Sequence, residues 1–257
     1  GDLDPAKTYE INHLGRARVS KLSKERGVSR YILASSASIY GQQEEVVDEN
    51  AAIKPLTAYS KANRKAEESA LPLNDDSFTV TALRFSSVYG ISPRMRFDLA
   101  VNGMVLDLFN KGKITVRGQG NKRPFVHILD VARAYEIIIN ASKEKIGGQI
   151  FNVGSDEQNY EMGQLAKEIT DGVGEECQLE LEDSPDHRSY AASFKKIRET
   201  LNFLPNYTVK QGAKEIHDAL KSGTLKDSKK TRTVEWYKTL LSDNILAKDV
   251  LVNGDVL

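Results

Sequence analysis

The sequence predicts an α/β fold with parallel strands in a larger lobe, and a second, smaller lobe that is mostly helical. Short apolar segments alternate with longer segments that carry helix caps. The first strand candidate, 31–34, is wholly apolar, which is typical of a strand buried on both faces of a parallel sheet. From about Asp156 onward the pattern becomes mostly helical, and this predicts the second lobe.

The first half of the chain predicts helices and strands in turn. Asp4-Pro5 is an N-cap followed by proline, and it opens a helix over about 6–26 with Ile11, Leu14 and Leu22 on one face. Gly27 ends that helix. The segments that follow are a strand at 31–34, a loop rich in Glu and Asn, a helix at 58–71 preceded by Thr57, and a strand at 78–83.

The same alternation continues to about residue 155. A helix is expected at 97–110 and ends at Gly112, and Asp130 is expected to cap a helix at 131–140. Strands are expected at 114–116 and 150–153, and later helices at 162–172, 194–201, 209–221 and 234–242.

Composition excludes several classes of protein. The 257 residues are 40% hydrophobic and carry zero formal net charge, so no nucleic-acid partner is expected. No apolar run approaches the ~20 residues that cross a membrane, so no membrane partner is expected either. The single cysteine, Cys177, indicates a reducing cytoplasm. The four histidines lack metal-ligand spacing, so no metal site is expected.

Glycine placement raises the question of where a dinucleotide would bind. Rossmann-type folds hold the pyrophosphate on a G-x-x-G-x-x-G-like loop between the first strand and helix. No such loop follows a strand here; Gly118-Gln119-Gly120 leads into Lys122-Arg123-Pro124 and not into a helix. We therefore expect that an N-terminal βαβαβ unit, with its phosphate loop, is absent from this sequence.

Two hydroxyl side chains, those of Ser36 and Tyr59, lie where a catalytic site is expected. Ser36 follows the first strand directly, and open α/β sheets bind ligands at the carboxyl ends of their strands. Tyr59 lies in the first turn of the next helix. A serine and a phenol brought together in this way can polarise a carbinol or carbonyl, with the tyrosine passing the proton.

Blocks of sequence in a particular order and spacing carry a family resemblance. They are INHLG from Ile11, LASSASIYG from Leu33, PLTAY from Pro55 running to Ala66-Glu67-Glu68, LRFSSVYG from Leu83, RPFVH from Arg123 with Asp130-Val131-Ala132, and FNVG from Phe151. On these blocks the chain resembles the extended short-chain dehydrogenases/reductases, of the NAD-dependent nucleotide-sugar epimerase/dehydratase family, over nearly its whole length.

The resemblance implies a fold and a reaction. Residues 1–90 and 124–155 would form the remainder of an NAD-binding Rossmann domain, and 91–123 and 156–257 a substrate-binding domain. Tyr59 would act as the acid/base and Ser36 would bond the substrate, so that a nucleoside-diphosphate sugar is epimerised through a transient 4-keto intermediate. NAD is the expected cofactor, with NADP not excluded, and a homodimer is expected through the helices at 6–26 and 58–71.

The resemblance also implies ligand contacts. The expected cofactor-binding residues are Ser35, Tyr59, Asn63, Phe85, Ser86 and Val88. The expected substrate-binding residues are Ser87, Asn102, Arg123 and Arg188. Arginine suits the two phosphate positions because its guanidinium pairs bidentately with phosphate oxygens.

The chain departs from the family pattern at two places. In the 4,6-dehydratase branch an Asp-Glu pair follows the catalytic serine, whereas Ala37 and Ser38 stand here, which leaves epimerase or ketoreductase chemistry. The family motif is Tyr-x-x-x-Lys, whereas Asn63 stands in the lysine position and brings no positive charge to stabilise a tyrosinate.

Neighbouring lysines do not fill the gap, since Lys61 and Lys65 lie at other angles around the helix. Asn63 is nevertheless kept among the candidate catalytic residues. Three alternatives stay open: slowed turnover, a cation supplied from the substrate lobe or from the absent segment, or a catalytically silent binding or regulatory protein. An NADPH-dependent 4-keto sugar reductase is a further alternative to the epimerase.

Overall fold

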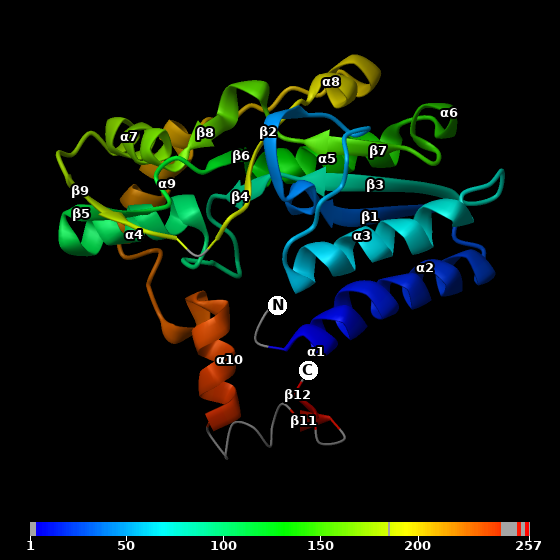
Figure 1. The fold of residues 1–257 in the computed structure, drawn as a ribbon, viewed down its shortest axis with the longest axis horizontal. Coiled ribbons are helices and arrows are strands. Elements are labelled where there is room, and N and C mark those ends of the chain that lie inside the picture. The colour runs from blue at the N-terminus through cyan, green and yellow to red at the C-terminus, as the bar shows by residue number, and fades with distance from the viewer. Residues whose placement is uncertain (1–3, 185, 243–250, 253–254, 257) are drawn as a thin grey trace.

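The computed structural model describes residues 4–184, 186–242, 251–252 and 255–256. Three parallel strands, β1 (Arg30–Ser36), β3 (Thr79–Phe85) and β7 (Ile150–Val153), form the main sheet in the order β1-β3-β7 (Figure 1). Ser36 pairs in register with Phe85, and Phe85 with Val153. The carboxyl ends of the three strands therefore meet at one edge, as expected for a ligand-binding α/β sheet.

The two faces of β3 are covered by different helices. Val80 and Ala82 pack in one apolar cluster with Ala66 and Ala70, which belong to α3 (Ala58–Ala70). Leu83 packs in a second cluster with residues of α5 (Ile128–Asn140). Alternate side chains of a strand point to opposite faces, so the apolar run of β3 is buried on both sides. The sequence predicted this burial for 31–34 in β1, where Leu33 is buried but Tyr31 and Ile32 are half-buried and Ala34 is exposed.

The predicted N-terminal helix is confirmed but contains an irregular stretch. The α-helices α1 (Pro5–Tyr9) and α2 (Arg16–Glu25) are joined by a π-helical stretch, Glu10–Gly15, and Gly27 follows with φ of 75°. Figure 1 shows α2 running beside α3 beneath the main sheet. A π-helical turn is wider than an α-helical one, so it changes the direction in which the next side chains leave the helix.

A second lobe lies beyond the carboxyl edge of the sheet (Figure 1). Its core joins α4 (Ala100–Lys111), α7 (Met162–Val173) and α9 (Val209–Lys221) with β5 (Lys113–Arg117). Gly112 ends α4 with φ of 65°, as the sequence predicts. The remaining helical elements are Ala37–Tyr40, Leu71–Leu73, α6 (Lys143–Ile146), Asp156–Gln158, α8 (Lys195–Leu201), Lys229–Thr231 and α10 (Thr233–Ser242).

Several strands were not predicted. The expected loop after β1 contains β2 (Gln42–Val47), which pairs in parallel with β10 (Ser189–Ala192). The expected mostly helical region also contributes β8 (Asn159–Glu161) and β9 (Gln178–Glu182). The other strands are β4 (Ser87–Tyr89), β6 (Lys122–His127), β11 (Leu251–Val252) and β12 (Asp255–Val256), with sheet orders β4-β6-β8 and β5-β9. β2 is mostly polar and has more exposed than buried residues, so apolar periodicity does not mark it. β9, by contrast, alternates Leu179 and Leu181 with Gln178, Glu180 and Glu182, a period-two pattern that the sequence did offer.

The prediction that Asp130 caps the α5 helix is wrong. The helix begins earlier, at Ile128, with His127 as its cap. Asp130 is buried and accepts hydrogen bonds from the backbone N–H groups of Asn206 and Tyr207, at 2.8 and 3.0 Å. It therefore fastens the segment before α9 to α5.

Within the described residues, no helix combines the length and the apolar character that crossing a bilayer requires.

Candidate functional site

Ser36 sits at the tip of β1, where the strand turns into a short 3₁₀ helix. Its Oγ accepts a hydrogen bond from the Ser38 backbone N–H at 3.2 Å and donates to the Ser38 Oγ at 2.9 Å. Main-chain and side-chain contacts thus fix the hydroxyl at the carboxyl end of the strand, where a ligand is expected.

Tyr59 lies in the first turn of α3, and this turn is held by a reciprocal cap. Thr57 Oγ1 accepts from the backbone N–H of Ser60, and Ser60 Oγ accepts from the backbone N–H of Thr57. Such a capping box fixes the start of a helix. Tyr59 is 38% exposed, so its side chain is only partly covered.

One cavity of about 820 Å³ brings most of the predicted residues together. Its lining includes eight of them: Ser36, Tyr59, Phe85, Ser86, Ser87, Val88, Arg123 and Arg188. The size falls within the range of small-ligand pockets. Met104, Asp186 and Tyr190 also line it, and the sequence did not single them out.

Three predicted residues do not line this cavity: Ser35, Asn63 and Asn102. Asn102 is buried, and its amide joins two backbone segments, since Oδ1 accepts from Gly90 N–H at 3.1 Å and Nδ2 donates to the Arg96 carbonyl at 3.0 Å. Its contacts are those of a residue that shapes the loop before α4.

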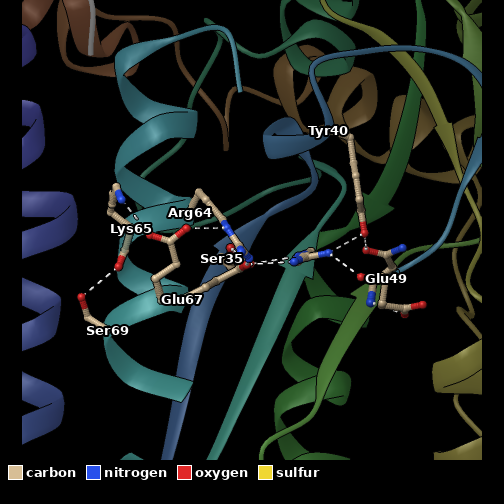
Figure 2. Close-up of polar contacts among 10 residues, drawn as sticks. Ser35, Tyr40, Glu49, Arg64, Lys65, Glu67 and Ser69 are labelled. Atoms are coloured by element: carbon tan, nitrogen blue, oxygen red, sulfur yellow. Dashed lines mark hydrogen bonds and ion pairs between the residues drawn. The ribbon is translucent and has the colours of Figure 1, made fainter. Parts of the chain in front are cut away.

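Ser35 belongs to a buried polar network behind the site (Figure 2). Its Oγ donates to Glu67 Oε1 at 2.6 Å, and Glu67 also accepts two hydrogen bonds from Arg84. Arg84 continues to Tyr40 Oη at 2.9 Å, and Tyr40 donates to Asn152 Oδ1 at 2.8 Å. The network links β1, α3, β3 and β7, so it fixes the helix that carries Tyr59 against the sheet.

Sequence reasoning missed this network, although a signal for it exists. An arginine stands inside the apolar segment Leu83-Arg84-Phe85, and a buried arginine requires a partner. Burial opposes the charge of Arg84, but the hydrogen bonds and charge of Glu67 outweigh it, and the pKa of Arg84 is raised.

Asn63 is fully buried one turn after Tyr59, and both ends of its amide are engaged. Nδ2 donates to the Tyr59 carbonyl at 2.9 Å, and Oδ1 accepts from Arg16 Nη1 at 2.6 Å. Lys65 pairs with Glu68 on the surface at 2.9 Å. The cation next to position 63 therefore comes from α2, a source that the sequence did not indicate.

Arg123 and Arg188 share one carboxylate. Asp186 Oδ2 lies 3.2 Å from Arg123 Nη2 and 2.6 Å from Arg188 Nη2. Burial works against the charge of Asp186, but Arg188 and then Arg123 hold its pKa well below the usual range. Arg123 also lies over the ring of Tyr190, and burial raises the pKa of Tyr190 to about 12. Two guanidinium groups thus converge on one anionic group in the cavity wall, a geometry that suits phosphate oxygens.

Ser86 offers a polar group without a protein partner. Its Oγ is buried, and no hydrogen-bond partner exists for it among the described residues. Gly154 lies against it, so closely that an added Cβ would clash with Ser86 Oγ and approach the Phe194 ring to 2.6 Å. A buried hydroxyl in a cavity wall needs a partner, which a bound ligand can provide.

No group of histidine, cysteine and acidic side chains that could hold a metal ion exists within the described part of the chain.

Comparison with known proteins identifies the family of the chain. The family model described as the NAD dependent epimerase/dehydratase family matches residues 2–154. An uncharacterised UDP-glucose epimerase of Bacillus subtilis is 25% identical over 200 residues, which cover 76% of this chain and 61% of the relative. A UDP-glucuronate 4-epimerase of Thermodesulfobacterium geofontis is 25% identical over 216 residues, which cover 82% and 65%. The chain thus spans less than two thirds of the length of these curated relatives.

Solved structures share the fold. The UDP-glucose 4-epimerase of Thermotoga maritima with UDP-glucose superposes with a TM-score of 0.76 at 21% identity, covering 87% of this chain and 74% of that one. A Pseudomonas aeruginosa structure complexed with NADPH gives a TM-score of 0.75 at 21% identity, covering 86% and 77%. These likenesses establish a Rossmann-type α/β fold.

Proposed function

Because the chain belongs to the NAD dependent epimerase/dehydratase family, we propose that it carries the proton-transfer and sugar-binding residues of an NAD-dependent nucleotide-sugar epimerase. One observation carries the proposal: the serine–tyrosine pair and two arginines that share a carboxylate line the same cavity, between the two lobes.

Each group has a chemical role in the proposal. Tyr59 takes the proton of a sugar hydroxyl and later returns it, and Ser36 bonds the same oxygen. Arg123 and Arg188 leave Asp186 to bind the diphosphate. Ser87, at the start of β4, contacts the sugar, and Ala37 and Ser38 offer no Asp-Glu pair for dehydration.

The residues at the ends of β3 and β7 fit a nicotinamide. Ser86 Oγ supplies an unpartnered donor and acceptor, Gly154 leaves the room that Ser86 Oγ and the Phe194 ring occupy, and Phe85 and Val88 add apolar walls to the cavity. NAD, when bound, supplies a reversible hydride acceptor, which is the chemistry an epimerase requires.

The test uses the full-length protein and a panel of UDP-, GDP-, dTDP- and CDP-sugars. We expect bound NAD and interconversion of one epimer pair without net consumption of cofactor. Neither bound NAD nor turnover on any sugar would reject the proposal. Tyr59→Phe, which removes only the phenol oxygen, should lower kcat by about 100-fold or more, whereas Tyr237→Phe, at a residue that does not line the cavity, should not.

A ketoreductase is the second candidate, because a GDP-6-deoxy-D-mannose reductase of Pseudomonas aeruginosa is 24% identical over 83% of this chain. Stoichiometric oxidation of NADPH on a 4-keto sugar would favour it. A silent binding protein, the third candidate, requires that no sugar is turned over although NAD or a nucleotide sugar binds.

The proposal includes a homodimer in the cytoplasm, formed through the helices α1–α2 and α3. Ile11, Leu14 and Leu22 are between 45% and 54% exposed, so an apolar surface is available on that side. Light scattering should give twice the protomer mass, and Leu14→Glu should halve it. A monomeric wild type would reject the dimer.

A further inference from the structure

Asn63 stands in α3 at the position of the family's lysine, and both ends of its buried side-chain amide are hydrogen-bonded. Asn63 Nδ2 holds the carbonyl of Tyr59, and Asn63 Oδ1 faces the guanidinium of Arg16 at 2.6 Å. An asparagine has no charge of its own, so any positive charge at this point of α3 has to come from its partner.

Arg16 is held there by acceptors from three separate elements. Besides Asn63 on α3, Nη1 donates to the Ala34 carbonyl on β1 at 2.9 Å, and Nη2 donates to Asn12 Oδ1 at 3.3 Å. Asn12 lies in the π-helical stretch that ends just before Arg16. Within the described chain, Nε–H and one N–H of Nη2 have no protein acceptor, so two donors remain for another group.

The charge of Arg16 affects two neighbouring tyrosines. Burial raises the pKa of Tyr31 and of Tyr135, and in both cases the charge of Arg16 acts in the opposite direction. Arg18, two residues further along, is exposed. The positive charge is therefore specific to Arg16, and it lies at the base of the turn that carries Tyr59.

We propose that Arg16 is a positioning residue for Tyr59: through Asn63 it fixes the first turn of α3 and provides the positive charge that position 63 lacks. The inference rests on the proposed function as far as turnover is concerned. Arg16 comes from the first lobe itself, so the site requires no cation from the substrate lobe.

A double-mutant cycle tests the charge relationship without any catalysis. Asn63→Lys places a second cation beside Arg16, in a buried position, and should lower the Tm by about 5 °C or more. In an Arg16→Gln background the same substitution should cost less than half of that shift, because the like charge is gone. Equal shifts in both backgrounds would overturn the inference.

Turnover provides the second readout, in the full-length protein. Arg16→Gln should lower kcat about 10-fold or more, while KM for the sugar changes less than about 3-fold, and Arg16→Gln with Asn63→Lys should recover most of the loss. Arg18→Gln removes the same charge from the exposed side of the helix and should leave kcat unchanged.

The two readouts separate the two proposals. If the wild type is active and Arg16→Gln matches Arg18→Gln, the role of Arg16 is wrong and the proposed function stands. If the wild type turns over no sugar, the proposed function is wrong, and the Tm cycle alone decides whether Arg16 and Asn63 form the charged unit.

Discussion

Arg84 and Glu67 form a buried, bidentate ion pair. Arg84 Nε and Nη2 donate to Glu67 Oε1 and Oε2, both at 2.9 Å, and the side chains are 1% and 0% exposed. Arg84 belongs to β3 and Glu67 to α3. The pair therefore sets the position of α3, which carries Tyr59, relative to the edge of the sheet where Phe85 and Ser86 line the cavity.

The first prediction concerns this pair. Glu67→Gln leaves the guanidinium of Arg84 buried without its counter-charge, and we expect a loss of about 3 kcal/mol in the free energy of unfolding. Glu68→Gln is the matched control, because Glu68 is exposed and pairs with Arg64 and Lys65 on the surface. Urea denaturation measures both. Equal losses would show that the buried pair contributes no more to the free energy of unfolding than a surface pair does.

The second prediction concerns Glu49, whose Oε1 accepts from the backbone N–H of Asn152 at 2.7 Å. Burial raises the pKa of Glu49 above that of the unfolded chain. The stability that this group contributes is therefore complete below pH 4.5 and is lost as the pH rises through the raised value, because the charged form is disfavoured in the folded state.

Glu49→Gln keeps an acceptor oxygen and removes the titration. The Tm of Glu49→Gln minus the Tm of the wild type should become more positive as the pH is raised from about 4 to 8. Glu44→Gln, on the exposed part of β2, should show no such trend. Thermal melts across the series decide it, and a Tm difference that is constant with pH would contradict the prediction.

Sequence reasoning reached the parts of the fold that follow from local composition. The strands β1, β3 and β7 each carry a short, mostly apolar run, and α9 carries its cap and its apolar face in sequence, so each can be predicted from local sequence. The segment Gln42–Val47 is polar, and it becomes a strand only because Ser189–Ala192, far along the chain, pairs with it. No local pattern carries that information.

The residues of the candidate site also divide into those that local sequence predicts and those that it does not. Ser36 and Tyr59 were predictable, because a strand end and a helix start fix where each side chain stands. The contact of Arg16 with Asn63 depends on the wider π-helical turn before Arg16 and on the packing of α2 against α3. Neither follows from periodicity at 3.6 residues per turn.

The third prediction concerns the two arginines that share Asp186. Arg123→Gln should raise KM for the nucleotide sugar by about 10- to 100-fold, because a charge-assisted hydrogen bond to phosphate is lost. Lys122→Gln is the matched control, since Lys122 is exposed and its ammonium lies 3.7 Å from Glu161 on the surface. Titration with the corresponding nucleoside diphosphate gives the same comparison without turnover. If the two variants bind equally, Arg123 does not hold the phosphates.

The fourth prediction concerns Gly154, at the end of β7. A Cβ at this position would clash with Ser86 Oγ and would lie 2.6 Å from each of two carbons of the Phe194 ring. Ser86 lines the cavity and Phe194 is part of the core, so moving either one disturbs the cavity wall or the core. Gly154→Ala should therefore lower the free energy of unfolding by about 1–3 kcal/mol and should weaken NAD binding, because the ring or the serine is pushed into the space that a ligand requires.

Gly120→Ala supplies the control for that substitution, because a Cβ at Gly120 meets nothing within 4 Å. Fluorescence titration with NAD and a thermal melt should separate the two variants in the full-length protein. If Gly154→Ala were as stable as Gly120→Ala and bound NAD equally well, the packing of Gly154 against Ser86 and Phe194 would play no part in cofactor binding. The unpartnered Ser86 hydroxyl would then need another ligand to explain it.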